Sequence, residues 1–499
     1  MNILTDFARF INSDRYQYTE SEVYLANQMH QQASIFNYFF RKTEDSNFAV
    51  VVGTESALSL VNMINHTKKD VKAGYFQKLG LSADLQEYLM EAQFNGDIYA
   101  MREGELSFAG EPVLTLLGDL VLAKIIETPL LNSFNYQMTI ASKASRITRS
   151  AGEIPVLAFG PRRAHGFDAS VLGTKAALIG GCAMHSAMAT EYFYGAPSIG
   201  SMSHSYIQSF GVGKEAEYLA FKTFANQMQR VGAPSIYFLI DTYDTLKSGL
   251  MNAIKIFQEI AIEHNEKLTY GIRLDSGDLA YFSKMCRKEL DLAGLHRAKI
   301  LLTNSLNEHL ISELKQQGAP FDLIGVGDSI ATSKDNPCFG GVYKLVEMEG
   351  KPVIKLSNDS IKISTPYHKD VYRIYQQGEA KADLITMANG DSDRDLLLAG
   401  KEITIISEED RLKATTFLAG SYEVERLTQP MMINGELTEL GRQQSNLTAS
   451  RAYYQQRLTT FSSERKRLVN PHHYKVNLST PLYEEKYRLI RELNEEIHR

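Results

Sequence analysis

The chain has 499 residues, of which 44% are hydrophobic and 22% charged, a composition typical of a soluble globular protein with about three domains. Its net charge of -6 and the lack of a basic stripe argue against a nucleic-acid-binding protein. No uncharged apolar run is long enough to cross a bilayer, and no signal peptide is recognisable. The three cysteines are too widely spaced for a disulfide framework, so we expect a protein of the reducing cytoplasm without membrane partners.

The first part of the chain predicts helices around a short β-rich segment. Ser82 is placed to cap a helix, with Leu85 and Leu89 one turn apart on its face. Residues 120–149 predict one long helix, because the apolar spacing is helical and no glycine interrupts it. Three short strands are predicted before it, at residues 97–101, 105–108 and 112–116.

From about residue 154 short apolar runs alternate with helical segments. Continuous apolar strands separated by helices predict a parallel sheet covered by helices. The alternation fits an α/β barrel, in which polar residues at the carboxyl ends of the strands carry the chemistry, and fits a doubly wound sheet equally well. The runs cover residues 155–159, 236–240, 270–274, 299–303 and 322–326.

The last part returns to strands and then to charged helices. Residues 342–347 and 371–375 have β character, and the chain is charged and helical from about residue 438. We therefore predict a central α/β barrel with a flanking α/β domain built from both chain ends. The predicted divisions are 1–150, 151–345 and 346–499.

The segment Gly200-Ser-Met-Ser-His204-Ser205 is the most informative stretch of the chain. It places one histidine among small residues, which leave room for a bulky group to reach the ring. A neutral imidazole is a usable nucleophile near pH 7, so His204 could accept a phosphoryl group and hold it covalently. A hydrogen-bonded loop histidine is the simpler interpretation of the segment alone.

Charged residues follow the predicted strands. Arg162 and Arg163 suit phosphates or a carboxylate, although a surface salt-bridge pair is the simpler interpretation. Arg273 lies inside an apolar run and needs a partner, because an unpaired buried charge is costly. With Asp275 it could grip an anion and sugar hydroxyls, or the segment could merely end a strand in an Asx-turn.

Asp241 follows another strand, where its carboxylate could orient a histidine or meet metal-bound phosphates. Asp244, three residues later, serves equally well as a helix N-cap.

The last two central strands predict a phosphate site. Asn304 and Ser305 end one strand, and Gly325 and Gly327 end the next. Glycine lets main-chain N–H groups approach a phosphate, and barrels often hold a phosphate at this pair of loops. The P-loop and Rossmann patterns are absent, and no metal-binding pattern such as HExxH occurs.

Taken together, these segments resemble the nicotinate phosphoribosyltransferase family, almost from end to end. Ser13-Asp-Arg-Tyr-Gln17 is similar to the family's TDLYQ, Phe159-Gly-Pro-Arg-Arg-Ala164 to FGLRRA, and Gly200-Ser-Met-Ser-His-Ser205 to GTMAHS. Further similar segments, in the same order as in the family, are Phe94–Tyr99, Glu111-Pro112, Glu127–Asn132, Asp241–Thr245, Arg273–Asp278, Gly325–Gly327, Gly340–Leu345 and Asn470–Tyr474.

The resemblance implies the irregular, TIM-like α/β barrel of a type II phosphoribosyltransferase, working as a homodimer. It implies transfer of phosphoribose from phosphoribosyl pyrophosphate to nicotinate in NAD salvage. ATP hydrolysis would be coupled to this transfer through a phosphohistidine, with magnesium carried mainly on the phosphates.

The resemblance also implies roles for single residues. His204 would be the phosphohistidine, with Ser205 beside it, and Asp275 would bind ribose hydroxyls or magnesium-bound phosphate. The remaining implied contacts are Tyr16 stacked on the pyridine ring from the neighbouring subunit, Gly200 near that ring, Arg273 on the substrate carboxylate or an adjacent phosphate, Arg162 and Arg163 on phosphates, and Asn304, Ser305, Gly325 and Gly327 around the 5′-phosphate.

The chain departs from the family pattern in a few places. Asp328 replaces the threonine of GVGT, and residues 180–187 replace GGFDGTSN. These departures are the support for a non-catalytic regulator on the same fold. Nicotinamide phosphoribosyltransferase is a second alternative, although residues 172–189 lack the acidic side chain that would read an amide. Quinolinate phosphoribosyltransferase lacks the histidine motif, and no lysine ends a strand as a Schiff-base barrel lyase requires.

Overall fold

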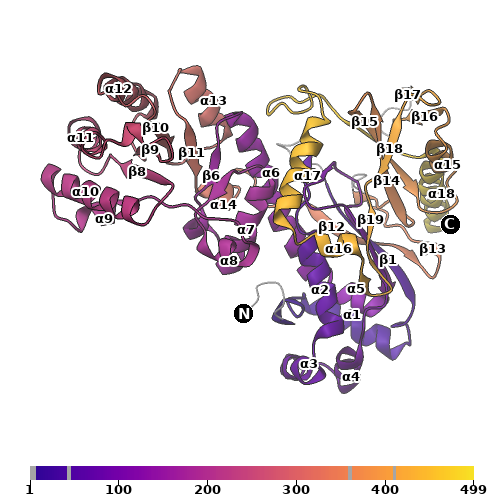
Figure 1. Cartoon of the computed structure of the whole chain (residues 1–499). Helices are drawn as coiled ribbons and strands as arrows, with labels where there is room; N and C mark the ends of the chain where they lie inside the picture. The colour runs from indigo at the N-terminus through magenta and orange to yellow at the C-terminus, as the bar shows by residue number, and fades with distance from the viewer. Residues whose placement is uncertain (1–6, 42–46, 358–361, 408–411, 499) are drawn as a thin grey trace. The chain divides into compact units, whose positions relative to one another are not determined.

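The computed structural model describes residues 7–41, 47–357, 362–407 and 412–498. The chain divides into two compact units, each with its own core (Figure 1). Unit 1 combines Met1–Ser142 with Cys338–Arg499, and unit 2 is Lys143–Pro337. In the described residues, no helix is long and apolar enough to cross a membrane. The predicted divisions at residues 150 and 345 stay a prediction.

Both ends of the chain build the main sheet of unit 1, which confirms the predicted flanking α/β region. Its strand β1 pairs antiparallel with β5 on one side and with β12, which comes about 300 residues later, on the other. The sheet order is β13 (Lys351–Pro352), β12 (Gly341–Met348), β1 (Ala33–Phe40), β5 (Leu114–Asp119), β3 (Asp97–Ala100), β19 (Gln429–Ile433) and β20 (Glu436–Leu437).

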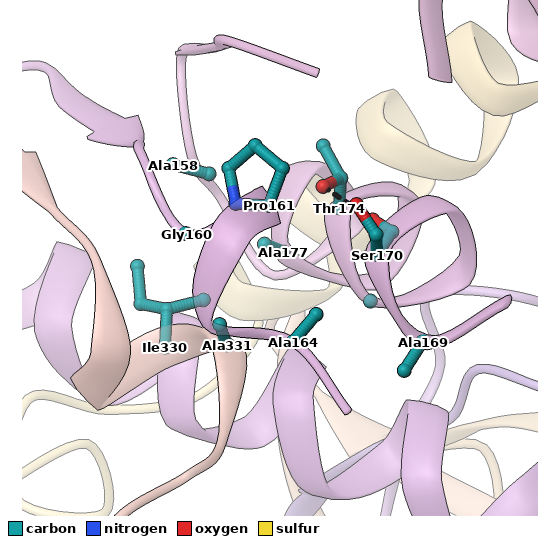
Figure 2. A pocket seen from close by; sticks show the side chains of 11 residues that line it. Ala158, Gly160, Pro161, Ala164, Ala169, Ser170, Thr174, Ala177, Ile330 and Ala331 are labelled. Carbon is teal, nitrogen blue, oxygen red and sulfur yellow. Dashed lines mark hydrogen bonds between the residues drawn. The ribbon is translucent and has the colours of Figure 1, made fainter. Parts of the chain in front are cut away.

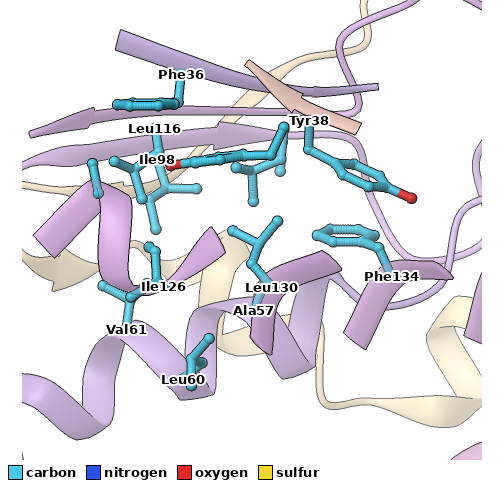
Figure 3. Close-up of a cluster of buried hydrophobic side chains, with 14 of the residues drawn as sticks. Phe36, Tyr38, Ala57, Leu60, Val61, Ile98, Leu116, Ile126, Leu130 and Phe134 are labelled. Atoms are coloured by element: carbon cyan, nitrogen blue, oxygen red, sulfur yellow. The ribbon is translucent and has the colours of Figure 1, made fainter. Parts of the chain in front are cut away.

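The core of unit 1 lies between this sheet and two helices (Figure 3). The rings of Phe36 and Tyr38 point from β1 toward side chains of α2 (Thr54–His66) and α6 (Glu127–Ala151). Tyr38 stacks on Phe134 of α6, with ring centroids 4.6 Å apart. Burying such apolar surface is the main favourable contribution to folding, so this layer holds the two chain ends together.

A second sheet of unit 1 surrounds a buried ion-pair network. The Arg373 guanidinium is fully buried and donates to the carboxylates of Asp383 and Glu105 and to the Leu106 carbonyl. Arg457 donates to the same Glu105. The order of this sheet is β18 (Glu423–Arg426), β14 (Lys369–Gln376), β15 (Glu379–Met387) and β21 (Lys475–Leu478), and the minor pairs are β2 (Ala49–Val50) with β4 (Leu106–Ser107) and β16 (Ile403–Ile406) with β17 (Ala414–Phe417).

The helix predicted over residues 120–149 is wrong in one respect, because it is broken at Ile126 into α5 (Leu120–Ile125) and α6. Pro129 has no N–H to donate to the Ile125 carbonyl, and the Ser13 hydroxyl donates to that carbonyl instead, at 2.6 Å. The helix predicted after Ser82 is confirmed as α4. The other helices of unit 1 are α1 (Arg15–Ala26), α3 (Lys69–Phe76), α4 (Ala83–Glu91), α15 (Ser392–Leu398), α16 (Glu439–Gln443), α17 (Leu447–Thr459) and α18 (Thr480–Ile497).

Unit 2 contains the predicted parallel sheet. The five predicted strands are confirmed, and a sixth, β7, was missed because it has two residues. The order β7-β6-β11-β10-β9-β8 describes an open half-barrel in which every neighbouring pair is parallel. The strands are β6 (Val156–Ala158), β7 (Met184–His185), β8 (Ser235–Leu239), β9 (Thr269–Leu274), β10 (Lys299–Leu302) and β11 (Leu323–Val326).

Helices cover these strands. Because the strands are parallel, their carboxyl ends lie at one edge of the sheet. Three stacked rings join α10, β8 and α11, with Phe238 4.6 Å from Phe221 and 4.9 Å from Phe257. Helices α10, α11 and α12 lie beside β8, β9 and β10 (Figure 1). The helices are α7 (Phe167–Ile179), α8 (Met188–Tyr194), α9 (His204–Gln208), α10 (Lys214–Arg230), α11 (Met251–Glu259), α12 (Leu279–Leu292), α13 (Glu308–Gln316) and α14 (Asp328–Ala331).

Candidate active site

His204 is the first residue of the short helix α9. The Ser203 side chain caps this helix by accepting from the Tyr206 N–H, so the histidine is presented at a helix start. Its side chain is 41% exposed. Nδ1 lies 3.1 Å from the Thr242 hydroxyl, in the turn after β8. This hydrogen bond fixes the orientation of the ring and leaves Nε2 accessible to a second group.

Two carboxylates face the free Nε2 atom of His204. Asp241 Oδ1 lies 4.0 Å from it and Asp275 Oδ2 lies 3.8 Å from it. The Asp241 side chain is 1% exposed, and its Oδ1 atom has no hydrogen-bond partner in the described part of the chain. Its other oxygen accepts from the Asp275 N–H and from the Ser276 hydroxyl, so the carboxylate is held rigidly. The ends of β8 and β9 thereby present two hard oxygen donors beside one imidazole.

Arg273 has the partner that its place in an apolar strand requires. It donates from Nη2 to Asp275 Oδ1 at 2.8 Å and from Nε to the Thr303 hydroxyl at 3.0 Å. Thr303 in turn donates to Asp275. Burial raises the pKa of Asp275, but the Thr303 hydrogen bond and the Arg273 charge outweigh it, so the pKa lies below the usual value of 3.8. Asp275 is therefore a carboxylate at neutral pH.

The two aspartates after β8 have different structural roles. Asp244 accepts from the main-chain N–H groups of Leu246 and Lys247, as expected of an N-cap. It begins a π-helical turn, Thr245–Leu250, that the sequence did not reveal. A Cβ atom on Gly249 would lie 1.9 Å from the Ile240 carbonyl oxygen, so only glycine lets this turn pack against the strand end.

The loop after β10 has an unusual main-chain conformation at both predicted phosphate residues. Asn304 has a φ of 90° and Ser305 a φ of 48°. Non-glycine residues rarely adopt this left-handed region, and strained backbone of this kind concentrates at functional sites. Both side chains are exposed and directly follow Thr303, so they belong to the same strand edge as Arg273.

Glycines bring the loops after β6 and β11 close together. A Cβ atom on Gly160 would lie 2.7 Å from the Gly327 carbonyl oxygen. A Cβ atom on Gly325 would lie 2.6 Å from side-chain carbons of Phe159 and Thr303. Gly325 is thus required by strand packing, whereas Gly327 has room for a side chain and lies at the open edge.

Arg162 and Arg163 lie on a short 3-10 turn, Pro161–Arg163, after β6. Both are exposed, and neither forms an ion pair with the described residues. A small pocket lies beside this turn (Figure 2). Small side chains line most of it: Ala158, Gly160, Pro161, Ala164, Ala169, Ser170, Gly173, Thr174, Ala177, Ile330 and Ala331. The turn after β6 thus presents two exposed guanidinium groups that form no ion pair with the described residues.

Three predicted contacts lie at exposed positions. Gly200 is exposed, and a Cβ atom there would meet nothing within 4 Å. The Ser205 hydroxyl lies 2.9 Å from that of Ser203. Tyr16 belongs to unit 1 and is 44% exposed on α1, with Lys124 Nζ 5.0 Å from its ring centroid.

The residues around Tyr16 explain the motif in which it lies. Gln17 is fully buried, and its side chain bonds the Asp14 N–H and the Thr128 hydroxyl. Together with the Ser13 bond to Ile125, these contacts hold the start of α1 and leave Tyr16 pointing outward.

The two departures from the family pattern have structural explanations of different kinds. His185 is 1% exposed at the end of β7, and main-chain groups satisfy both of its ring nitrogens. Asp328 is the first residue of α14, where a carboxylate is favourable to the helix dipole, and its side chain forms no ion pair with the described residues.

The structure thus brings His204, Asp275, Arg273 and the residues after β10 to one edge of the half-barrel sheet. The roles assigned to them, and to the two arginines and the glycines, stay predictions. Sequence reasoning missed Thr242 and Thr303, whose hydroxyls join these groups. Thr303 directly follows β10, and Thr242 comes three residues after β8 ends, so their closeness to strand ends is the signal that could have found them. No group of three or more metal-binding side chains occurs among the described residues.

Comparisons with known proteins agree with this geometry. Family models of the N-terminal and C-terminal domains of nicotinate phosphoribosyltransferase match residues 11–135 and 368–486. The nicotinate phosphoribosyltransferase of Bacillus subtilis is 37% identical over 501 residues, 98% of this chain and 96% of the relative. That of Dictyostelium discoideum is 28% identical, with 97% and 89% covered.

Solved structures show the same fold. Human nicotinic acid phosphoribosyltransferase has a TM-score of 0.79 at 24% identity, covering 96% of this chain and 99% of that one. The architecture is therefore the two-domain fold of a type II phosphoribosyltransferase. Because the similarity to the Bacillus subtilis relative extends over nearly the whole length of both chains, this chain belongs to the nicotinate phosphoribosyltransferase family.

Proposed function

We propose that this protein converts nicotinate and phosphoribosyl pyrophosphate to nicotinate mononucleotide and pyrophosphate, with ATP hydrolysis coupled through a phosphorylated His204. One observation carries the proposal furthest. His204 Nε2 is accessible and faces Asp241 and Asp275 at the edge where Arg273 and the strained loop after β10 also lie. The names of the relatives supply the substrate and the reaction.

The transfer step needs positioning and charge stabilisation more than a strong base. The pyridine nitrogen of nicotinate attacks the anomeric carbon while pyrophosphate leaves, and positive charge builds on the ribose. Asp275 is ionised and can accept from ribose hydroxyls or stabilise that charge. Asn304, Ser305, Gly325 and Gly327 would hold the 5′-phosphate.

The remaining predicted residues would bind the substrates. Arg162 and Arg163 would hold other phosphates, because their guanidinium groups are exposed and unpaired with the described residues. Arg273 would bind the nicotinate carboxylate or an adjacent phosphate. Gly200 would leave room for the ring, and Tyr16 of a neighbouring subunit would stack on it, which makes a homodimer the working form.

The phosphoryl step uses the imidazole as a nucleophile. Nδ1 is paired with Thr242, so Nε2 attacks the γ-phosphorus of ATP and ADP leaves. Water later takes the phosphoryl group and releases inorganic phosphate. Magnesium would neutralise phosphate charge, and the oxygens of Asp241 and Asp275 fit its preference for hard ligands. Ser205 would lie beside the phosphorylated ring. We also propose that the protein acts in the cytoplasm.

The test is product formation with magnesium and phosphoribosyl pyrophosphate, comparing nicotinate with nicotinamide, each with and without ATP. We expect nicotinate mononucleotide, formed faster with ATP. His204→Ala should abolish the ATP stimulation and leave a slow ATP-independent transfer. Product from nicotinamide alone would favour the amide enzyme. No product from either base would favour a non-catalytic regulator, with Asp328 the first residue to revert to threonine.

A further inference from the structure

We propose that Glu191 and His185 clamp the segment before Gly200 and thereby position His204 for phosphoryl transfer. Glu191 is a positioning residue for ATP coupling, and it does not touch the substrates. The proposal rests on the proposed role of His204 and assigns a purpose to the region where the chain departs from its family.

His185 ties the segment to the edge of the sheet. Its ring Nε2 lies 3.0 Å from the Ala196 carbonyl oxygen, to which it donates, and its Nδ1 accepts from the Ala187 N–H. The His185 carbonyl accepts from the Ile199 N–H at 2.8 Å. His185 also forms a parallel bridge with Ser198, so the segment extends the sheet beyond β7. One buried residue thus holds three positions of the segment.

Glu191 holds the same segment from the side of α8. One of its carboxylate oxygens accepts from the Ser198 N–H at 2.8 Å and from the Ser198 hydroxyl at 2.5 Å. These hydrogen bonds from Ser198 lower the pKa of Glu191, so the accepting carboxylate form prevails at neutral pH. Charge-assisted bonds are stronger than neutral ones, so the two bonds that Glu191 accepts from Ser198 are a second hold on the segment.

The clamp lies just before a stretch of the described main chain that forms no main-chain hydrogen bonds. No main-chain hydrogen bond fixes the described residues Gly200–Met202, and the next fixed point is the Ser203 cap of α9. Residues 196–199 are therefore the last segment held by main-chain hydrogen bonds before the Ser203 cap, with the buried Met202 between the two. A shift of the segment would displace Nε2 from Asp241 and Asp275.

Small displacements matter more for phosphoryl transfer than for folding. Misplacing a reacting group by about 1 Å can slow a reaction by about 100-fold. Glu191 lies near the surface, and Pro197 and Gly200 of the segment are exposed, so losing the Glu191 hydrogen bonds alone costs little stability. The clamp should therefore affect ATP coupling selectively.

The experiment compares Glu191→Ala with Glu191→Gln and with Glu153→Ala, an exposed carboxylate of unit 2 as the matched control. The measurements are acid-labile phosphate on His204 from γ-labelled ATP, ATP consumed per product, ATP-independent transfer and the thermal midpoint. In Glu191→Ala we expect His204 phosphorylation to fall by about tenfold or more, while ATP-independent transfer changes by less than about twofold.

Glu191→Gln should retain most of the phosphorylation, because the amide oxygen still accepts from Ser198, and Ser198→Ala should lie between the two. The proposal is overturned if Glu191→Ala is phosphorylated at the parental rate, or if both activities fall together with the thermal midpoint. His204→Ala separates this failure from a failure of the proposed function: if that variant keeps ATP coupling, the phosphohistidine itself is wrong.

Discussion

The half-buried carboxylate of Asp275 stays ionised because its hydrogen-bonding and charged neighbours lower its pKa more than burial raises it. Thr303 and Arg273 both donate to Asp275, and its pKa lies below 3.8. The ionised form therefore stabilises the fold above about pH 4, and this contribution is lost as the pH falls through the lowered pKa. Across the range in which enzymes of neutral pH work, the charge of Asp275 is constant.

This constancy gives a prediction for Asp275→Asn. We expect the rate of nicotinate mononucleotide formation to fall by about 100-fold, because a preorganised charge at the reacting edge is lost. The shape of the rate profile between pH 5 and 9 should stay that of the parent. The measurement is kcat/KM against pH for both proteins. An acid limb that is present in the parent and missing in the variant would show that Asp275 titrates in this range.

At the scale of elements, short caps decide where the site residues lie. Asp244 caps the π-helical turn Thr245–Leu250, and Asp241 and Thr242 lie just before this cap. A π-helical turn is rare and is found mostly at functional sites. Its hydrogen-bond pattern, with the Gly249 N–H on the Asp244 carbonyl, spaces the strand end from α11.

Asp244→Ala should weaken this turn. Loss of an N-cap costs about 1 kcal/mol, which lowers the midpoint of thermal unfolding by about 2–4 °C in a unit of this size. Because Thr242 holds the His204 ring, we also expect weaker ATP stimulation. Calorimetry and the ATP-dependent rate check both effects. Asp244→Asn, which keeps an acceptor, is the control and should behave like the parent.

Sequence patterns were informative about elements and less so about the contacts between them. The apolar runs of β8 to β11 predicted the parallel strands, and the Ser82 cap predicted α4. The break at Ile126 follows from Pro129, which helical apolar spacing alone does not reveal, and the compensating hydrogen bond comes from Ser13, more than 100 residues away. Strand β7 is too short to show a period. The hydroxyls of Thr242 and Thr303 became visible as site residues when neighbouring strands placed them beside His204 and Asp275.

At the scale of the whole molecule, unit 1 depends on joining the two chain ends. The buried guanidinium of Arg373 pairs with Glu105 from the N-terminal part and with Asp383 from the C-terminal part. Burial raises the pKa of Glu105, but Arg373 and Arg457 outweigh this effect and lower it overall. The stability from Glu105 is thus present above its usual pKa of 4.5 and is lost as the pH falls through the lowered value.

We expect Arg373→Met to destabilise unit 1 by about 3–5 kcal/mol, because two buried carboxylates lose a common partner. The chain has no tryptophan, so urea unfolding followed by far-UV circular dichroism measures this loss of stability. The control is Arg488→Met, which removes a surface arginine of α18 with exposed carboxylate partners and should cost less than about 1 kcal/mol. Equal effects of the two substitutions would contradict the importance of the buried network.

The pairing of β1 with β12 also limits when unit 1 can complete its fold during synthesis. Phe36 leaves the ribosome about 300 residues before its partner Leu345, a wait of about 15–60 s at ordinary elongation rates. All of unit 2 emerges within that interval and can fold first. Meanwhile β1 exposes aromatic side chains and an open strand edge, the kind of surface that recruits chaperones or aggregates. The N-terminal strands of the nascent chain therefore have to avoid aggregation until the C-terminal strands have been synthesised.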